Sequence, residues 1–277
     1  MRIDTSSQYD ETGVLLRAAG LSRRYTRGGW MSRRRQLEVL RAVDLKIEAG
    51  STVALIGASG SGKSTLARCL ACLEEPDSGE IWFAGQNLAR LRQRELAPFR
   101  RQIQLIFQEP DASLNPRFPA VEIVSEPLLI ARLGTKRKRR EQALELMELV
   151  GLGAHLGSRL PGELSGGQRR RLAIARALAL QPRILILDEA LTGLDLSTRA
   201  QISNLLLRLQ EVCSLTYLCI SHDFGLVSHF ADEVVVMDNG RIVEGGVPEL
   251  AANSGRLQPG DSLTDALTLS SPPVELP

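Results

Sequence analysis

Apolar residues gather in short runs through the middle of the chain, and each run is followed by a segment with helical character. The runs predicted as strands are 50–56, 183–187 and 216–220. A helix is expected after each run: the first begins at Gly62, the second begins at Ser197, and the third extends through Leu226. Short apolar strands that alternate with helices are typical of a parallel sheet covered on both faces. The pattern therefore predicts an α/β fold.

Two other patterns add parts to this core. Residues 38–47 (EVLRAVDLKI) alternate apolar and polar side chains, as a half-exposed antiparallel strand does. Helical periodicity in 139–150 and 167–178 predicts a helical insertion at about 109–178. The folded part is expected to span 14–250, because the polar start and the tail 251–277, rich in Ser, Pro, Gly and Thr, have compositions that seldom pack a core.

Composition limits the class of protein. The 277 residues carry 34 Lys and Arg against 32 Asp and Glu, a formal net charge of +2, and 43% are hydrophobic, as in globular proteins. Apolar runs all fall short of the roughly 20 residues that a membrane-spanning helix needs. The polar N-terminus has no apolar stretch of the kind found in secretory signals. We therefore expect a protein of the cytoplasm.

Two local patterns have competing interpretations. Cys69 and Cys72 form a CxxC, which suggests metal or redox chemistry, but the segment is predicted as a helix in which the pair shares one apolar face. Packing is favoured, because neither a second CxxC nor a His pair completes a metal site. The basic run 136–140 (KRKRR) could bind nucleic acid or an anionic membrane. A solvated helix face is favoured for it, because aromatic residues are absent nearby.

A phosphate-binding loop is indicated by the segment 57–65 (GASGSGKST), which matches G-x-x-x-x-G-K-[ST] between a predicted strand and a predicted helix. Glycines let backbone N–H groups converge on phosphate oxygens, and the helix N-terminus adds partial positive charge. We expect Lys63 to reach the β- and γ-phosphates and the Ser64 hydroxyl to bind Mg²⁺. The strand-to-helix context disfavours a chance glycine-rich turn. The nucleotide-binding residues predicted here are Gly57, Ser59, Gly60, Ser61, Gly62, Lys63, Ser64 and Thr65.

Two carboxylates follow the apolar strand at 184–187. Asp188 suits Mg²⁺, and Glu189 is suited to polarise the water that attacks the γ-phosphate, as a general base. The carboxyl ends of strands are where α/β sheets place their ligands. Two acidic residues after a strand are common, but downstream of a phosphate-binding loop they become a strong indication of a nucleotide hydrolase.

A third motif, Leu164 to Gln168 (LSGGQ), begins a basic helix and offers a second anion-binding helix start. The chain has no second phosphate-binding loop for it to serve, so we expect it to serve another chain. Here the sequence resembles the ATP-binding subunits of ABC transporters, of which LSGGQ is the signature. Their other motifs stand in order: the phosphate-binding loop, Gln108 in LIFQ, the signature, LDE at 187–189, Asp195 in TGLD, and His222 in ISHD.

The resemblance covers nearly all of 14–250 and implies an α/β P-loop NTPase (RecA-like) core with an antiparallel β subdomain and a helical insertion. It implies a Mg²⁺-dependent ATPase in which Gln108 senses Mg²⁺ and the attacking water, His222 bonds the γ-phosphate, and Asp195 organises the contact between two facing sites. Ser165, Gly166, Gly167 and Gln168 would close on ATP held by a partner subunit. The implied catalytic set is Lys63, Gln108, Glu189 and His222, and the implied metal ligands are Ser64, Gln108 and Asp188.

The family also stacks the nucleotide base on an aromatic residue upstream of the phosphate-binding loop. Tyr25 matches that position. Trp30 is the alternative, because an insertion at 27–36 separates Tyr25 from the next strand.

The subgroup is indicated by residues 107–117 (FQEPDASLNPR), which resemble a stretch of the importers for oligopeptides, dipeptides, nickel and opine-like metal chelates. The insertion around Trp30 and the phrase at 236–244 resemble the second, shorter ATPase of nickel- or dipeptide-type systems. This resemblance implies a second ATPase subunit, with a heterodimer favoured over a homodimer. It also implies two membrane permeases, indirectly a solute-binding protein, and a place at the cytoplasmic face of the membrane.

The chain departs from the family in two places. The tail 251–277 has neither the HPYT element nor the cysteine cluster of some members, which argues against an iron–sulfur cluster. Thr192 and Gly193 replace the usual Ser-Ala, a conservative change.

Two other functions compete with an importer ATPase. An ABC ATPase of DNA repair or translation would clamp nucleic acid, but such proteins usually need a second ATPase unit or a long coiled coil, for which 277 residues leave no room. We therefore expect no nucleic acid partner. A P-loop kinase acting on a small molecule would explain Lys63 but would leave LSGGQ without a purpose.

Overall fold

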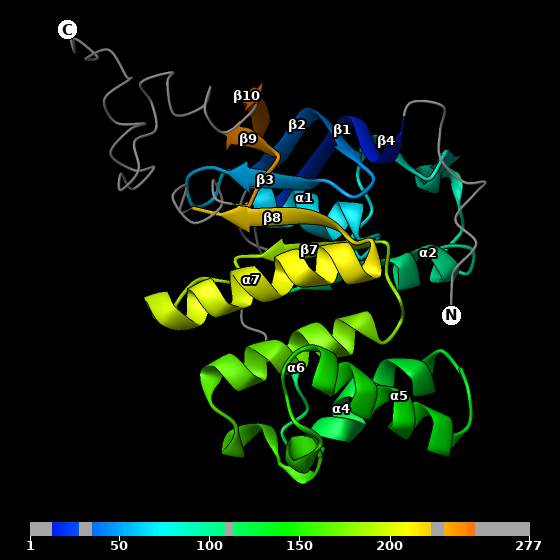
Figure 1. The fold of residues 1–277 in the computed structure, drawn as a ribbon. Helices are drawn as coiled ribbons and strands as arrows, with labels where there is room; N and C mark the ends of the chain where they lie inside the picture. The colour runs from blue at the N-terminus through cyan, green and yellow to red at the C-terminus, as the bar shows by residue number, and fades with distance from the viewer. Residues whose placement is uncertain (1–12, 28–34, 109–112, 223–229, 247–277) are drawn as a thin grey trace, which may run out of the picture. The chain divides into compact units, whose positions relative to one another are not determined.

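The computed structural model (Figure 1) describes residues 13–27, 35–108, 113–222 and 230–246. By its internal contacts the chain divides into two compact units, residues 1–91 with 218–277, and residues 92–217. Among the described residues, no helix has the length and the hydropathy that crossing a bilayer requires.

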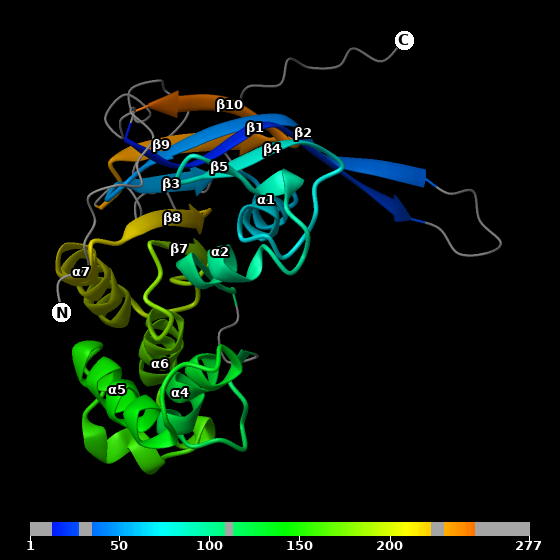
Figure 2. The same ribbon diagram turned by 90° about the vertical axis from the view of Figure 1, so that its right-hand side faces the viewer.

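The first unit contains a four-stranded antiparallel sheet. Its strands are β1 (Val14–Arg27), β2 (Arg35–Glu48), β4 (Ser78–Phe83) and β5 (Gln86–Asn87), in the order β2-β1-β4-β5. In β2 the side chains of Leu40, Val43, Leu45 and Ile47 are buried, and most of those between them are exposed. The half-exposed strand predicted at 38–47 is therefore confirmed, and Figure 2 shows β1 and β2 as a long pair.

A second sheet in the same unit carries the phosphate-binding loop. The strands of this sheet that belong wholly or partly to the first unit are β3 (Thr52–Ile56), β8 (Thr216–Ser221), β9 (Glu233–Asp238) and β10 (Arg241–Gly246). They lie in the order β10-β9-β3-β8, and the division between the units falls inside β8. β3 is buried along its whole length and pairs in parallel with β9. Helix α1 (Lys63–Leu70) follows β3, and a short 3₁₀ helix, Leu88–Arg90, follows β5. A strand buried on both faces explains its unbroken apolar sequence.

The second unit has its own parallel pair of strands. β6 (Ile103–Ile106) pairs with β7 (Ile184–Asp188), and the N–H of Thr216 at the start of β8 donates to the carbonyl of Arg183 at 3.0 Å. Helix α2 (Ala97–Gln102) precedes β6, and helix α7 (Leu196–Cys213) follows β7. The carboxyl ends of β6 and β7 therefore lie side by side.

Three helices fill the middle of this unit, and the periodicity at 139–150 and 167–178 predicted the second and third of them. They are α4 (Ala120–Ile130), α5 (Lys136–Leu149) and α6 (Gly166–Leu178), with 3₁₀ helices at Ala154–Ser158 and Pro161–Glu163. Figure 2 shows α4, α5 and α6 packed together, and an ion pair of 2.9 Å joins Arg176 on α6 to Glu126 on α4. At the start of α5, four of the five residues in the basic run are exposed.

The helix after the phosphate-binding loop is shorter than predicted. α1 ends at Leu70, and Cys72 lies beyond it with a φ of 57°, so the expectation that Cys69 and Cys72 share one helix face is wrong. Both side chains are nevertheless buried, and burial raises the pKa of the Cys69 thiol to about 12. A protonated thiol is a poor nucleophile, and a buried one packs as a small apolar side chain.

Some predictions lie outside the described residues. These are the end of the helix expected through Leu226, the position of Trp30, and the tail 251–277. The boundaries given for the folded part and for the helical insertion stay predictions.

Candidate nucleotide-binding site

The loop between β3 and α1 is shaped by close approaches of the backbone. A Cβ at Gly57 would lie 2.1 Å from the carbonyl oxygen of Met237 and 2.9 Å from the Ser61 hydroxyl. A Cβ at Gly62 would lie 2.8 Å from the carbonyl oxygen of Val39, and the φ of Gly62 is +110°. No side chain fits at either position, so glycine is required by space at Gly57 and by both space and conformation at Gly62.

Two polar groups in this loop fit a bound phosphate. The Lys63 ammonium is buried and donates to the carbonyl oxygens of Gly57 at 2.7 Å and Ala58 at 2.9 Å. The Ser61 hydroxyl is buried and has no hydrogen-bond partner among the described residues. A buried hydroxyl without a partner costs roughly 1–3 kcal/mol. A phosphate oxygen in the loop would accept from this hydroxyl and offset that cost.

The start of α1 adds donors to the same loop. Gly62 is the N-cap of the helix, and it has no side chain to accept the N–H groups of the first turn. Such N–H groups, together with the positive end of the helix, favour a phosphate oxygen. The loop as it is folded therefore fits a bound phosphate group.

Tyr25 lies on β1, in the same unit as the loop. Its hydroxyl accepts a hydrogen bond from Nη2 of Arg68 on α1 at 3.3 Å, and the guanidinium of Arg23 lies 5.2 Å from the centre of its ring. Nη2 of Arg68 also donates to the Thr65 hydroxyl at 3.2 Å. The aromatic residue predicted for the base is thus connected to the phosphate-binding helix.

In the second unit, the carboxyl ends of β6 and β7 bring two predicted catalytic residues together. Nε2 of Gln108, which follows β6, donates to Oε2 of Glu189, which follows β7, at 2.7 Å. Glu189 has a φ of 50°, in the left-handed region that a non-glycine residue seldom adopts. Asp188 is the last residue of β7, precedes Glu189 in the sequence and is buried. The Glu189 carboxylate is thus held by a side chain 81 positions away.

The signature motif forms the capped start of α6. The Ser165 hydroxyl accepts from the N–H of Gln168 at 3.2 Å, and the Gln168 side chain accepts from the N–H of Ser165 at 2.9 Å. Ser165 and Gly166 are exposed. This reciprocal pairing is a capping box, which fixes where the helix begins.

The start of α7 lies against the start of α6. Asp195 caps α7, since its Oδ1 accepts from the N–H of Thr198 at 2.9 Å, and the bonds from the Thr198 backbone and hydroxyl lower the pKa of the Asp195 carboxyl. A Cβ at Gly167 would lie 2.9 Å from the Thr198 methyl group. The signature and the Asp195 segment are therefore neighbours.

Sequence reasoning missed the role of Arg170. Its Nη1 donates to the carbonyl oxygen of Gln108 at 3.3 Å, and its Nη2 donates to that of Thr192 at 3.1 Å. It thereby joins the segment of Gln108 to the segment that leads to Asp195. The sequence gives no sign of this, because Arg170 stands between two other arginines.

The remaining predicted residues are divided between the units. His222 directly follows β8 and is exposed, in the first unit with Ser64. Asp188 and Gln108, the other predicted metal ligands, belong to the second unit. The metal set therefore stays a prediction.

Comparison with known proteins shows to which family a chain with these features belongs. Residues 40–192 match the family model described as ABC transporter, which is more than half of the chain. The chain belongs to the ABC transporter family. The resemblance drawn from the phosphate-binding loop and LSGGQ is thereby confirmed, and the chain is an ATP-binding ATPase of this family.

Relatives of this ABC protein are named for dipeptide transport and for nickel import. The chain is 43% identical to the dipeptide transport ATP-binding protein DppF of Haemophilus influenzae, over 88% of this chain and 75% of that protein. It is 43% identical to the nickel import ATP-binding protein NikE of Escherichia coli, over 83% of this chain and 86% of that protein.

Solved structures confirm the P-loop NTPase fold class of this ABC ATPase. One is a dimeric post-hydrolysis state of the ATP-binding cassette MJ0796 bound to ADP and phosphate, with a TM-score of 0.75 and 31% identity, covering 84% of this chain and 99% of that one. Another is cbiO1 from Clostridium perfringens, part of an ABC transporter complex, with a TM-score of 0.75 and 28% identity, covering 87% and 92%.

Proposed function

We propose that this protein hydrolyses MgATP to power a bacterial importer for peptides, nickel or opine-like metal chelates. The hydrogen bond of 2.7 Å between Gln108 and Glu189 carries the hydrolytic part, because it holds a carboxylate at the end of β7 in a defined orientation. The import part is supported by relatives of 43% identity that are named for dipeptide transport and nickel import. No relative cited here supports the nucleic acid alternative.

The chemistry is divided among the residues of the two units. Lys63, Ser61 and the first turn of α1 bind the triphosphate, and Mg²⁺, when bound by Ser64, Gln108 and Asp188, supplies charge neutralisation. Glu189 takes a proton from the attacking water as general base, which typically contributes about 10²- to 10⁴-fold. His222 bonds the γ-phosphate, and Tyr25 stacks on the base.

Two exposed residues of the signature motif support an assembly of two ATPases. Ser165 and Gly166 are exposed at the positive end of α6, where they can close on the nucleotide of another subunit. We infer a partner ATPase, in a heterodimer rather than a homodimer, with Asp195 at the contact. The helical insertion, 109–178, meets two permeases at the cytoplasmic face of the membrane, and a solute-binding protein delivers the solute.

Uptake measurements in the host test the import function. Deletion of the gene should abolish uptake of a labelled dipeptide or of radioactive nickel. The intact gene should restore uptake, and so should Lys46→Ala, which removes an exposed lysine of β2. Lys63→Ala should not restore it, because the ammonium in the phosphate-binding loop is lost. Undiminished uptake of both solutes in the deletion strain would exclude these two solute classes while leaving the ATPase activity standing.

A further inference from the structure

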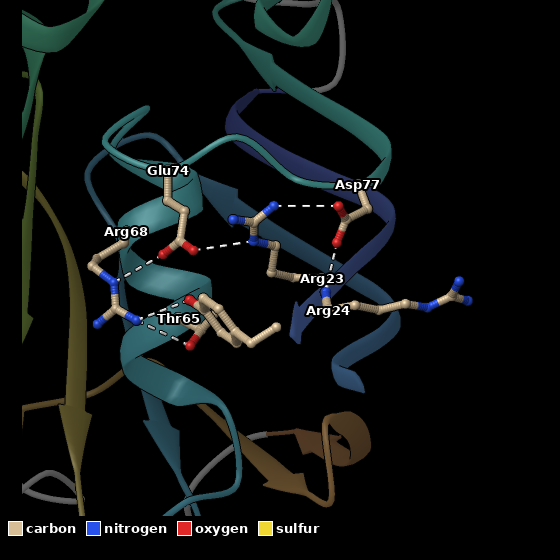
Figure 3. A network of polar contacts seen from close by, with 7 residues as sticks. Arg23, Arg24, Thr65, Arg68, Glu74 and Asp77 are labelled. Carbon is tan, nitrogen blue, oxygen red and sulfur yellow. Dashed lines mark hydrogen bonds and ion pairs between the residues drawn. The ribbon is translucent and has the colours of Figure 1, made fainter. Parts of the chain in front are cut away.

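Arg23, Arg68, Glu74 and Asp77 form a network of charged side chains (Figure 3). Two of its members, Arg23 and Arg68, contact Tyr25. The carboxylate of Glu74 joins two guanidiniums, since its Oε1 accepts from Nε of Arg23 at 3.0 Å and its Oε2 accepts from Nε of Arg68 at 3.1 Å. Arg23 also donates from Nη1 to Asp77 at 3.3 Å. The other oxygen of Asp77 accepts from the backbone N–H of Arg24 at 2.6 Å. The network thus fixes strand β1 to α1 and to the segment that follows it.

The network is partly shielded from water. The side chain of Glu74 is 17% exposed, that of Arg23 is 24% exposed and that of Arg68 is 37% exposed. Ion pairs in open water contribute little, whereas a connected network with defined geometry holds its members in place. Glu74 is its centre, because it binds both arginines that contact Tyr25.

The two arginines hold Tyr25 from different sides. Arg68 bonds the hydroxyl at the tip of the ring, and Arg23 lies over one face of the ring. Both contacts restrict the orientation of the ring. Arg68 also bonds Thr65, two positions after Lys63, so that one guanidinium contacts both the Tyr25 hydroxyl and the first turn of α1, where the phosphate-binding motif ends.

We propose that Glu74, Arg68 and Arg23 are positioning residues, which fix the ring of Tyr25 for stacking of the nucleobase and tie it to the loop at Thr65. This inference rests on the proposed role of Tyr25 in binding ATP. A ring that is already ordered loses less conformational freedom when the ligand binds, and this raises affinity. The gain in affinity arises from stacking of the nucleobase, so binding of the phosphates alone does not show it.

The alternative is that the network only supports the fold of the loop. Positioning of Tyr25 and support of the loop both predict weaker ATP binding when Glu74 is changed. A ligand that has phosphates but no base distinguishes the two roles. Inorganic tripolyphosphate is that probe. A merely structural network would affect tripolyphosphate and ATP alike.

The experiment measures binding of ATP and of tripolyphosphate to the whole isolated chain, without turnover. Glu74→Gln should weaken ATP binding about 5-fold, equivalent to roughly 1 kcal/mol, and should change tripolyphosphate binding less than about 2-fold. Glu80→Gln is the matched control. Glu80 also accepts from an arginine, Arg90 at 3.1 Å, but it lies outside the network, so both ligands should bind it as they bind the unchanged protein.

A double-mutant cycle adds a second readout. In a Tyr25→Ala background, Glu74→Gln should cause no further loss of ATP affinity, because the ring that it positions is gone. Tyr25→Phe keeps the ring but removes the hydroxyl that Arg68 bonds. It should weaken ATP and spare tripolyphosphate, and it serves as the test if Glu74→Gln does not fold.

Three results would overturn the inference. They are an equal loss for both ligands in Glu74→Gln, an undiminished effect of Glu74→Gln without Tyr25, and unchanged ATP affinity in Tyr25→Ala. Each would leave the ATPase function intact. That function would fail separately, through full ATP turnover in Lys63→Ala.

Discussion

Gly57 and Gly60 stand three positions apart in the phosphate-binding loop, but they are glycines for different reasons. At Gly57 a Cβ would lie 2.1 Å from the backbone of Met237, on the neighbouring strand β9. At Gly60 a Cβ would meet nothing within 4 Å, although the φ of +81° is strained for other residues. Lack of space therefore requires glycine at position 57, whereas the backbone conformation favours glycine at position 60.

Alanine at each position should separate these two causes. Gly57→Ala must push β9 away from the loop, and we expect a loss of stability of about 2–3 kcal/mol together with a loss of ATP binding. Gly60→Ala should cost about 1 kcal/mol, the price of a left-handed alanine. Denaturant unfolding and ATP binding measure both effects. Equal stability of the two variants would show that the loop can move away from Met237.

The charge on Glu74 depends on its partners. Burial by itself raises the pKa of this carboxyl, but hydrogen bonds to Tyr25, Arg68 and Arg23 and the charge of Arg68 outweigh burial, so that the pKa lies below its ordinary value. A folded-state pKa below the unfolded one stabilises the fold above the unfolded pKa. That stabilisation is lost as the pH falls through the folded pKa.

The stability of the Glu74→Gln variant should therefore depend on pH in a defined way. Its deficit relative to the unchanged protein should be full at pH 6 and should shrink once the pH falls below about 4, the ordinary range for Glu. Denaturant unfolding at several pH values measures the deficit. Glu75→Gln, the exposed neighbour, controls for the general loss of a carboxylate. A deficit that stays constant down to pH 3 would show that the Glu74 ion pairs do not contribute.

At the scale of elements, helix α6 begins where its capping box dictates. Ser165 and Gln168 bond each other's backbone N–H groups, and the sequence pattern alone placed the helix start within one residue. The cap also orients the exposed signature. The same two side chains thus stabilise the start of α6 and hold the signature motif in place.

Removing the cap should destabilise the protein without unfolding it. Ser165→Ala should lower the free energy of unfolding by about 1 kcal/mol, whereas Ser165→Asn keeps a capping oxygen and should lose far less. Thermal unfolding compares the two variants. If alanine and asparagine behave alike, the hydrogen bond from the Gln168 N–H does not stabilise the helix.

The elements predicted best are those with an unbroken local pattern. The apolar runs at 50–56, 183–187 and 216–220 became β3, β7 and β8 with small shifts. The end of α1 was not predictable, because the helix ends in a Schellman motif whose left-handed position is Cys72 instead of the usual glycine. The N–H of Leu73 donates there to the carbonyl of Arg68 at 2.9 Å.

The residues of the candidate site also differ in how well the local sequence predicts them. Lys63, Glu189 and Ser165 stand in motifs that carry their chemistry in the local sequence. The contacts of Arg170 with Gln108 and Thr192, and of Glu74 with two arginines, depend on which segments the fold brings together. No local pattern reports such contacts, so only the structure reveals them.

At the scale of the whole molecule, the residues proposed for one nucleotide come from this chain and from a second subunit. Lys63, Tyr25 and Glu189 are proposed to act on the nucleotide that the chain itself binds. By our proposal, Ser165 acts on the nucleotide of the partner. ATP affinity of the isolated chain and turnover of the assembly are therefore separable properties.

Ser165→Arg should separate them. The added side chain lies at an exposed helix start, so nucleotide binding to the isolated chain should be unchanged, while ATP turnover of the assembled transporter should be blocked. Ser165→Asn, which keeps the cap and adds less bulk, should retain more turnover. Equilibrium binding and phosphate release measure the two properties. A large loss of ATP affinity in the isolated Ser165→Arg chain would contradict the assignment to the partner's nucleotide.

Phosphate release by Glu189→Gln in the assembled transporter tests most directly whether Glu189 is the base for ATP hydrolysis. Glutamine keeps an oxygen that can accept from Gln108 but cannot take a proton from water. We expect turnover to fall by about 10²- to 10⁴-fold, with ATP binding retained and the ATP-held dimer trapped. Undiminished turnover in this variant would contradict the role of Glu189.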